Sequence, residues 1–274
     1  MIGQATLCNL IDSQITRNTF PRCSIFVGPK GSGKKLIAKY VAKQLGADVI
    51  QVDGKIDVVR DVIKLAYTNY NKTVFVFTDA EKMSQNAENA LLKILEEPPN
   101  NAYIIITAIS ENVLLDTIKS RCVIMHMDRY TPDELFEYYW SLEGTDIMPS
   151  GMPNEAEIVK VVCETPGEVQ QFITQGVSKV YGYAELVFDN IRYVTGANAL
   201  KIGNRIAFKD DDKDKIDITL FFKSFLNICG SRLDNITAQW VQITFHYLNQ
   251  LSWKGVNKTM LFDNWVLDCR AVAL

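Results

Sequence analysis

Two hydrophobic patterns alternate along the first half of the chain. Short, nearly continuous apolar runs occur at 23–28, 48–52, 73–78, 103–107 and 122–127. Apolar residues recur at helical spacing in the segments between them, at 34–47, 58–69, 84–97 and 111–119. Buried strands produce the first pattern and amphipathic helices the second. Their alternation predicts an α/β fold with a parallel sheet covered by helices on both faces.

The pattern changes after Asp128, where strands are no longer predicted and helical spacing continues to the end of the chain. The TPDE stretch at 131–134 has a threonine N-cap, a proline in the first turn and a glutamate three residues after the cap, as helix starts do. Two interruptions, 139–154 and the charge run 209–215, are interpreted as loops. A long helix is predicted over 235–251. Domain edges are therefore expected near residues 129 and 180, which gives the segments 1–129, 130–180 and 181–274.

Composition narrows the classes of function. The chain has 274 residues, of which 47% are hydrophobic, so it can bury an ordinary core. A net charge of -3 argues against a free-standing nucleic-acid binder, but not against a subunit that touches nucleic acid within an assembly. No apolar run approaches the roughly 18 residues of a membrane span, and the first residues lack the basic leader of a signal peptide. We therefore expect a cytoplasmic protein without a membrane partner.

Cysteine and histidine give no sign of a metal site. No two cysteines have the C-x-x-C spacing, so we expect no zinc. His126 and His246 are the two histidines, and neither has a sequence neighbour that suggests a catalytic pair. Both are interpreted as structural. The six scattered cysteines are interpreted as buried or partly buried thiols: Cys8, Cys23, Cys122, Cys163, Cys229 and Cys269.

The stretch GPKGSGKK, between a predicted strand and a predicted helix, has the form of a phosphate-binding loop. It consists of Gly28, Pro29, Lys30, Gly31, Ser32, Gly33, Lys34 and Lys35. The glycines allow backbone N–H groups to point inward, and the following helix adds the positive end of its dipole. Lys34 is placed to meet the β- and γ-phosphates of a nucleotide. ATP, ADP or phosphate is therefore the candidate ligand, although none is required by the sequence.

Hydrolysis would need groups that the chain lacks at the expected places. A hydroxyl after the loop lysine and an acid at the end of a nearby strand jointly hold magnesium. Lys35 replaces the hydroxyl, and its charge competes with a metal. The strand motif has two acidic positions. In one alignment Thr78 occupies the first position, which holds the metal, and Asp79 occupies the second. In an alignment shifted by one residue, Asp79 occupies the first position and is itself the metal ligand. In either frame the loop hydroxyl is missing.

Four further motifs resemble those of the bacterial DNA polymerase III clamp-loader AAA+ subunits. They are IGQ at 2–4, NALLKILEEPP at 89–99, SRC at 120–122 and TPGEVQQF at 165–172. The resemblance covers about residues 1–180. It implies an AAA+ P-loop domain over 1–129, a helical lid over 130–180 and a helical collar over 181–274, the collar being the oligomerisation domain.

Within that family the chain is most similar to the delta-prime type. Motor subunits carry a threonine after the loop lysine, an Asp-Glu pair on the strand and an arginine in the second-sensor helix, and this chain has none of the three. The resemblance implies a stator without ATPase activity of its own. Arg121 of the SRC motif would be the arginine finger that it supplies in trans. The implied partners are gamma/tau-like motor subunits and a delta subunit, with the sliding clamp and primed DNA reached through the complex.

Three alternatives accompany this interpretation. The chain could be an active motor that holds its metal through Asp79 and water. It could be another AAA+ replication protein, such as an initiator, although no basic recognition module is present. Arg121 could be an ordinary surface ion pair at a helix end. The chain also lacks the four-cysteine zinc insert of many delta-prime subunits, and its collar is short.

Overall fold

The computed structural model describes residues 2–52, 54–143, 155–193, 200–207, 215–251, 253 and 255–273. The chain divides into two compact units, Met1–Tyr130 and Thr131–Leu274. The first contains the sheet, and the second is mostly helical. A further division of the second unit at residue 180 remains a prediction, and that residue falls inside a helix, Val177–Asn190.

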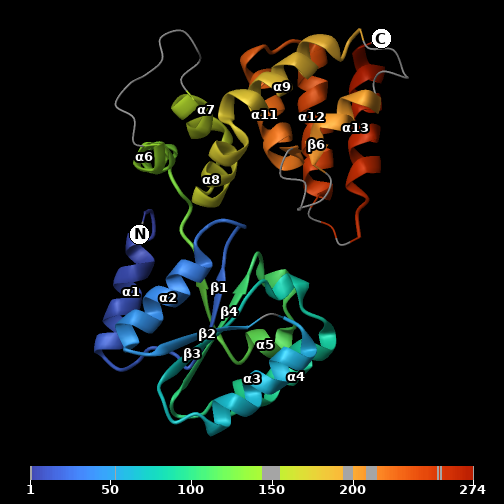
Figure 1. Cartoon of the computed structure of the whole chain (residues 1–274). Helices are drawn as coiled ribbons and strands as arrows, with labels where there is room; N and C mark the ends of the chain where they lie inside the picture. Colours follow the sequence, from blue (N-terminus) through green and yellow to red (C-terminus); the bar gives the residue numbers. More distant parts are fainter. Residues whose placement is uncertain are drawn as a thin grey trace. The chain divides into compact units, whose positions relative to one another are not determined.

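The first unit is built on a five-stranded parallel sheet (Figure 1). Its strands are β1 (Cys23–Val27), β2 (Asp48–Val52), β3 (Thr73–Phe77), β4 (Ala102–Ala108) and β5 (Val123–His126). Their order across the sheet is β2-β3-β4-β1-β5. β1, β3 and β4 are buried along their whole length, as expected for central strands rich in β-branched and aromatic residues. The predicted parallel α/β fold is confirmed.

Helices cover both faces of this sheet (Figure 1). α1 (Ala5–Thr16) and α2 (Lys34–Leu45) pack on one face with side chains such as Phe26 and Ile105. α3 (Ile56–Thr68), α4 (Gln85–Glu96) and α5 (Asp116–Lys119) pack on the other. Since neighbouring side chains of a strand point to opposite faces, each central strand contributes to both apolar layers.

The sheet order brings two loops to one edge. β4 lies between β3 and β1, so the segments that follow β1 and β3 leave the sheet on either side of the end of β4. The glycine loop follows β1, and Thr78 and Asp79 follow β3. In a parallel sheet the carboxyl ends of all strands share one edge. The topology therefore determines that the loop and the residues after β3 face each other.

The second unit is a set of packed helices. They are α6 (Pro132–Glu143), α7 (Glu155–Val162), α8 (Pro166–Gln175), α9 (Val177–Asn190), α11 (Ile218–Ser231), α12 (Asn235–Gln250) and α13 (Lys258–Ala273), with a 3-10 turn η3 (Leu200–Arg205). Its core is aromatic, and two indoles are anchored by hydrogen bonds. Trp240 Nε1 donates to the Cys269 carbonyl at 2.6 Å, and Trp265 Nε1 donates to Thr244 Oγ1 at 2.9 Å. Buried indole N–H groups need such partners.

The cap predicted for α6 is present. The Thr131 N–H donates to Glu134 Oε2 at 2.8 Å, and the Glu134 N–H donates to Thr131 Oγ1 at 3.2 Å. This reciprocal pair satisfies two N–H groups that the first turn leaves without helical partners.

Three local predictions were wrong. Strands do recur after Asp128, as a two-residue parallel pair of β6 (Ile206–Ala207) and β7 (Ile216–Asp217). So short a pair carries no periodicity that a sequence pattern could reveal. The predicted loop 139–154 begins later, because α6 continues to Glu143. The predicted helix 111–119 is two pieces, the 3-10 turn η2 (Glu111–Val113) and α5.

Two predicted loops cannot be compared in full. Residues 144–154 and 209–214 lie outside the described residues. Among the helices that are described, none combines the length and the apolar character needed to cross a bilayer.

Candidate functional site

The glycine loop keeps the backbone form of a phosphate cradle. Gly31 and Gly33 have φ of 82° and 89°, which residues with a side chain rarely adopt. Gly28 has a different reason to be glycine: a Cβ there would lie 2.7 Å from the Cβ and Cγ of Met127. Pro29 and Lys30 are exposed on the outer side of the loop, whereas Ser32 is buried. The loop thus closes tightly against the end of β5.

Lys34 is the buried cation of the loop, with only 8% of its surface exposed. Its Nζ donates to the carbonyl oxygens of Gly28 at 2.6 Å and Pro29 at 2.7 Å. Burial lowers the pKa of this ammonium, while the carboxylates of Glu81 and Asp79 oppose the shift. A buried ammonium satisfied by loop carbonyls is poised to exchange those partners for phosphate oxygens.

Lys35 lies where the loop hydroxyl would be, and it points to the residues after β3. Its Nζ donates to Asp79 Oδ2 at 3.2 Å, and Lys82 Nζ lies 3.5 Å from the same oxygen. Burial alone would raise the pKa of the Asp79 carboxyl, but the two ammonium groups outweigh it and hold that pKa below its usual value. Asp79 is therefore an ionised carboxylate already engaged by two cations of its own chain.

Asp79, not Thr78, is the residue whose side chain meets the loop. Thr78 directly follows β3, is buried, and donates its N–H to the Val52 carbonyl at 3.2 Å. Asp79 has φ 54°, a left-handed conformation that is uncommon outside glycine, and begins the short 3-10 turn η1 (Ala80–Lys82). Its N–H donates to Thr107 Oγ1 on β4 at 3.1 Å. The choice between the two frames for the strand acid still requires a functional test.

Magnesium does not fit this set of donors. The metal prefers several oxygen ligands in near-octahedral geometry. Lys35 supplies a cation in place of the hydroxyl oxygen, and Asp79 is already paired with it and with Lys82. The arrangement is that of a phosphate loop whose metal ligands have been replaced by an internal ion pair.

Two residues near the loop, Tyr130 and Gln4, make contacts that were not predicted from the sequence. Tyr130 donates its hydroxyl to the Ser32 carbonyl at 2.8 Å and so ties the loop to the end of the first unit. Gln4 is fully buried; its Nε2 donates to the Asp128 carbonyl and its Oε1 accepts from the Asp128 N–H, both at 2.9 Å. Gln4 belongs to the IGQ motif, but no local pattern gives its partner, 124 residues away.

Arg121 lies just after α5 and about one third of its side chain is exposed. Its Nε and Nη2 donate to Glu96 Oε1 at 3.1 and 2.7 Å, and its Nη1 donates to the Thr117 carbonyl at 2.8 Å. Glu96 comes from the LLKILEEPP motif at the end of α4. The sequence analysis singled out the motif, but not this contact. Arg121 is thus held at the surface of the first unit, far along the chain from the glycine loop.

Each of the two histidines lies beside a polar side chain. His126 Nε2 lies 3.0 Å from Glu111 Oε1, a contact across 15 residues that the sequence analysis did not consider. His246 Nε2 lies 2.7 Å from Gln250 Nε2 within α12. Among the described residues, no group of three or more His, Cys, Asp or Glu side chains gathers as a metal site would require.

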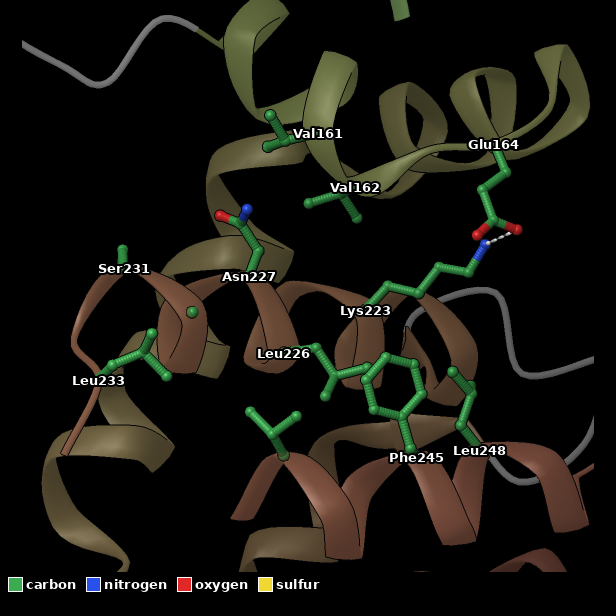
Figure 2. A pocket seen from close by; sticks show the side chains of 12 residues that line it. Val161, Val162, Glu164, Lys223, Leu226, Asn227, Ser231, Leu233, Phe245 and Leu248 are labelled. Atoms are coloured by element: carbon green, nitrogen blue, oxygen red, sulfur yellow. Dashed lines mark ion pairs between the residues drawn. The ribbon is translucent and has the colours of Figure 1, made fainter. Parts of the chain in front are cut away.

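The helical unit has a groove of its own, of about 660 Å³, shown in Figure 2. It is lined by Val161, Val162, Glu164, Lys223, Leu226, Asn227, Gly230, Ser231, Leu233, Val241, Phe245 and Leu248. Residues of α11 and α12 form most of the lining, and its apolar side chains come from these two helices, from α7 and from Leu233. At one end Lys223 Nζ pairs with Glu164 Oε2 at 3.1 Å and with Glu168 Oε1 at 2.8 Å. The groove contains no phosphate-loop residue and is not part of that site.

Comparison with known proteins finds similarity to subunits of DNA polymerase III. The family model described as "DNA polymerase III, delta subunit" matches residues 46–131. The delta' subunit of Haemophilus influenzae is 40% identical over 32% of this chain and 28% of its own length. The gamma subunit of Buchnera aphidicola subsp. Acyrthosiphon pisum is 24% identical over 100% of this chain and 83% of its own length. The family model and both relatives are described as subunits of DNA polymerase III, so this chain is similar to that family.

A solved structure extends the agreement to the fold of the whole chain. The DNA polymerase III gamma subunit-related protein of Thermotoga maritima superposes with a TM-score of 0.52 at 17% identity, covering 99% of this chain and 100% of its own. At that identity the match concerns the fold alone. The chain spans about half or less of the length of several curated clamp-loader relatives it matches, such as the tau subunit of Bacillus subtilis. The DNA polymerase III relatives that the chain matches include gamma, tau and delta' subunits.

Proposed function

We propose that the chain is a delta-prime-like stator of a DNA polymerase III clamp loader, which helps to load the sliding clamp without hydrolysing ATP itself. The observation that carries this proposal is the ion pair of 3.2 Å between Lys35 and Asp79. It stands where a motor subunit needs a hydroxyl and a free acid for magnesium. The 40% identity to a delta' subunit, although confined to 32% of the chain, supports the same choice.

Arg121 is the group through which such a subunit would take part in catalysis. We propose that it reaches the γ-phosphate of ATP bound to a neighbouring motor subunit. A guanidinium offers two parallel hydrogen bonds to phosphate oxygens and offsets charge that develops during phosphoryl transfer. Its present partner, Glu96, is 52% exposed, and ion pairs at such exposure contribute about 0–1 kcal/mol. A multiply charged phosphate can therefore compete for Arg121.

The partners follow from this role. A gamma/tau-like motor subunit contacts the surface that carries Arg121. The delta subunit, the clamp and primed DNA are partners within the assembled complex. Within the helical unit, we propose that the part near α6–α8 is the lid and that the remaining helices form the collar. Since residue 180 lies inside α9, the border is better set at Gly176, between α8 and α9.

Reconstitution with motor, delta and clamp subunits tests the proposal. Arg121→Ala should leave the chain folded and the complex assembled. It should lower the ATPase rate that the clamp and DNA stimulate. The loss should be partial because several sites in one complex hydrolyse ATP. At a single site, loss of a trans arginine lowers the hydrolysis rate by on the order of 10³ or more. Arg121→Lys should restore little, because an ammonium cannot form the paired hydrogen bonds.

Two control variants distinguish an arginine-finger role of Arg121 from the general effect of removing a surface charge. Arg60→Ala removes another exposed arginine, on α3, and should leave the ATPase unchanged. Glu96→Gln removes the charge that holds Arg121 within its own chain, and should not lower the ATPase. An Arg121→Ala complex that assembles and hydrolyses ATP at the unmodified rate would show that Arg121 is an ordinary surface ion pair.

An active motor subunit is the second candidate. The match of a gamma subunit to 100% of this chain favours it. Such a motor would have to hold magnesium through Asp79 and water, against two ammonium groups. ATP turnover by the isolated chain, abolished by Lys34→Ala, would support this alternative over the stator.

A further inference from the structure

The cation that faces Asp79 belongs to the chain itself. Lys35 Nζ and Lys82 Nζ both lie against Asp79 Oδ2, at 3.2 and 3.5 Å. In a hydrolysing loop, a metal ion connects the acid to the phosphates. Here Lys35 starts from the loop and ends at the acid, so its ammonium lies between the same two elements. The Lys35 ammonium therefore takes the place that the metal ion has in a hydrolysing loop.

The loop beside this ion pair retains a built cradle for an anion. α2 begins directly at the loop, with the N–H groups of its first turn directed there, and Lys34 adds a cation that is more than nine-tenths buried. The Ser32 hydroxyl is 99% buried, and its Oγ has no hydrogen-bond partner in the structure. That oxygen lies 3.0 Å from the point where a Cβ on Gly28 would be, so it is close to the first glycine of the loop. A buried hydroxyl without a partner is costly, and a phosphate oxygen would satisfy it.

We propose that this loop binds a di- or triphosphate anion without magnesium, with the Lys35 ammonium, held by Asp79, in the place of the metal. The proposal rests on the proposed function in one respect, that the chain does not hydrolyse ATP itself. It names the ligand by its chemistry: a free polyphosphate chain, with or without a nucleoside.

Charge favours the free anion over its magnesium complex. Around the loop, Lys34, Lys35 and Lys82 outnumber Asp79 and Glu81. Magnesium neutralises part of the charge of a triphosphate, so the complex is attracted less strongly by a site that already holds its own cations. Added metal would also meet Lys35 at close range. Binding should therefore be no tighter with magnesium than without it.

Calorimetric titration of the full chain tests this inference, once in EDTA and once in excess magnesium chloride. ATP, ADP and tripolyphosphate should bind in EDTA, and AMP should bind at least about tenfold more weakly, since it lacks the outer phosphates. Lys35→Met keeps an unbranched apolar side chain without its charge and should bind ATP about tenfold more weakly in EDTA. Lys34→Met should lose more affinity for ATP than Lys35→Met does. Lys39→Met, exposed further along α2, is the matched control and should bind as the unmodified chain does.

The arms of the titration also identify the source of the ligand. Equal affinity for tripolyphosphate and ATP would support recognition of the phosphate chain alone, and tighter ATP would support an added nucleoside contact. Binding seen only with magnesium would overturn the inference, as would unchanged binding by a folded Lys35→Met chain or the absence of binding by every phosphate tested. None of these results alters the Arg121 measurement, which is read on a motor subunit in the complex, so the two proposals fail independently.

Discussion

At the residue scale, single side chains decide what the site can do. Lys35 converts a position that would offer a hydroxyl oxygen into a cation, and the 3.2 Å contact to Asp79 removes the acid that a metal would use. Lys34 retains the burial and the position of a phosphate-binding lysine. The loop thus keeps the form of a phosphate-binding loop and lacks the hydroxyl that would hold magnesium.

The first prediction concerns repair of the loop. The isolated chain should show no ATPase above background, and Lys35→Thr alone should remain inactive, because it supplies one metal ligand and leaves Thr78 in the place of the strand acid. Steady-state phosphate release with excess magnesium is the measurement, with Lys35→Ala as the control. Hydrolysis by Lys35→Thr, but not by Lys35→Ala, would identify Asp79 as the metal ligand and would rule out the frame that starts at Thr78.

The second prediction concerns the packing of the loop. Gly28→Ala places a Cβ 2.7 Å from Met127, and overpacking of this kind destabilises by about 1–3 kcal/mol. Urea denaturation of the variant should show this loss, and Gly28→Ala should cost less in a Met127→Ala background, where the Met127 Cγ is absent although its Cβ remains. Gly182→Ala on α9, where a Cβ meets nothing within 4 Å, should instead stabilise by about 0.4–1 kcal/mol. Equal effects of the two glycine substitutions would contradict the predicted contact.

At the element scale, local chemistry starts the helices and tertiary contacts hold them. Asp234 caps α12 by accepting from the N–H groups of Ile236 and Thr237, while Thr237 Oγ1 accepts from the Asp234 N–H in return. Arg192, two residues beyond the end of α9, adds an ion pair at 3.0 Å to the same carboxylate. A helix start in the sequence thereby becomes a link between two helices.

The third prediction follows from that cap. The backbone N–H of Thr237, and then Arg192, lower the pKa of Asp234 to about 2. Because the folded pKa lies below the unfolded value of about 3.9, this stabilisation is complete above pH 4 and is lost as the pH falls toward 2. Asp234→Asn should lower the thermal midpoint at pH 7.

The pH dependence distinguishes the charge from the hydrogen bond. The difference in urea midpoint between the unmodified chain and Asp234→Asn should narrow between pH 4 and pH 3. Asp61→Asn, in an exposed pair on α3, serves as the control and should show a much smaller difference at pH 7. A difference for Asp234→Asn that stays constant down to pH 3 would show that the carboxylate charge does not contribute.

At the scale of the whole molecule, the two units have separate cores. The apolar clusters of the sheet unit contain no residue beyond Met127, and the aromatic core of the helical unit draws on α9, α11, α12 and α13. Each unit buries its own apolar surface, which is the condition for folding alone.

The fourth prediction tests this division. A chain ending at Tyr130 should unfold cooperatively in urea and keep its phosphate loop, because both apolar layers of the sheet are complete within it. It should fail to co-elute with motor subunits if the helical unit carries the main assembly contact, as proposed for the collar. Unchanged co-elution would move that contact to the sheet unit. A chain ending at residue 180 is a poor test, since it cuts α9 away from α11.

The sequence by itself determined the parallel sheet, its covering helices and the glycine loop, because these depend on periodicity and turn chemistry over short distances. It also determined that Lys35 cannot serve as a metal ligand, since that follows from the side chain alone. Only the tertiary structure decided what Lys35, Arg121 and Gln4 contact. Their partners lie 44, 25 and 124 residues away, and no local pattern encodes such distances. Strand order brought the first pair together, because the carboxyl ends of β1 and β3 meet on one edge of the sheet.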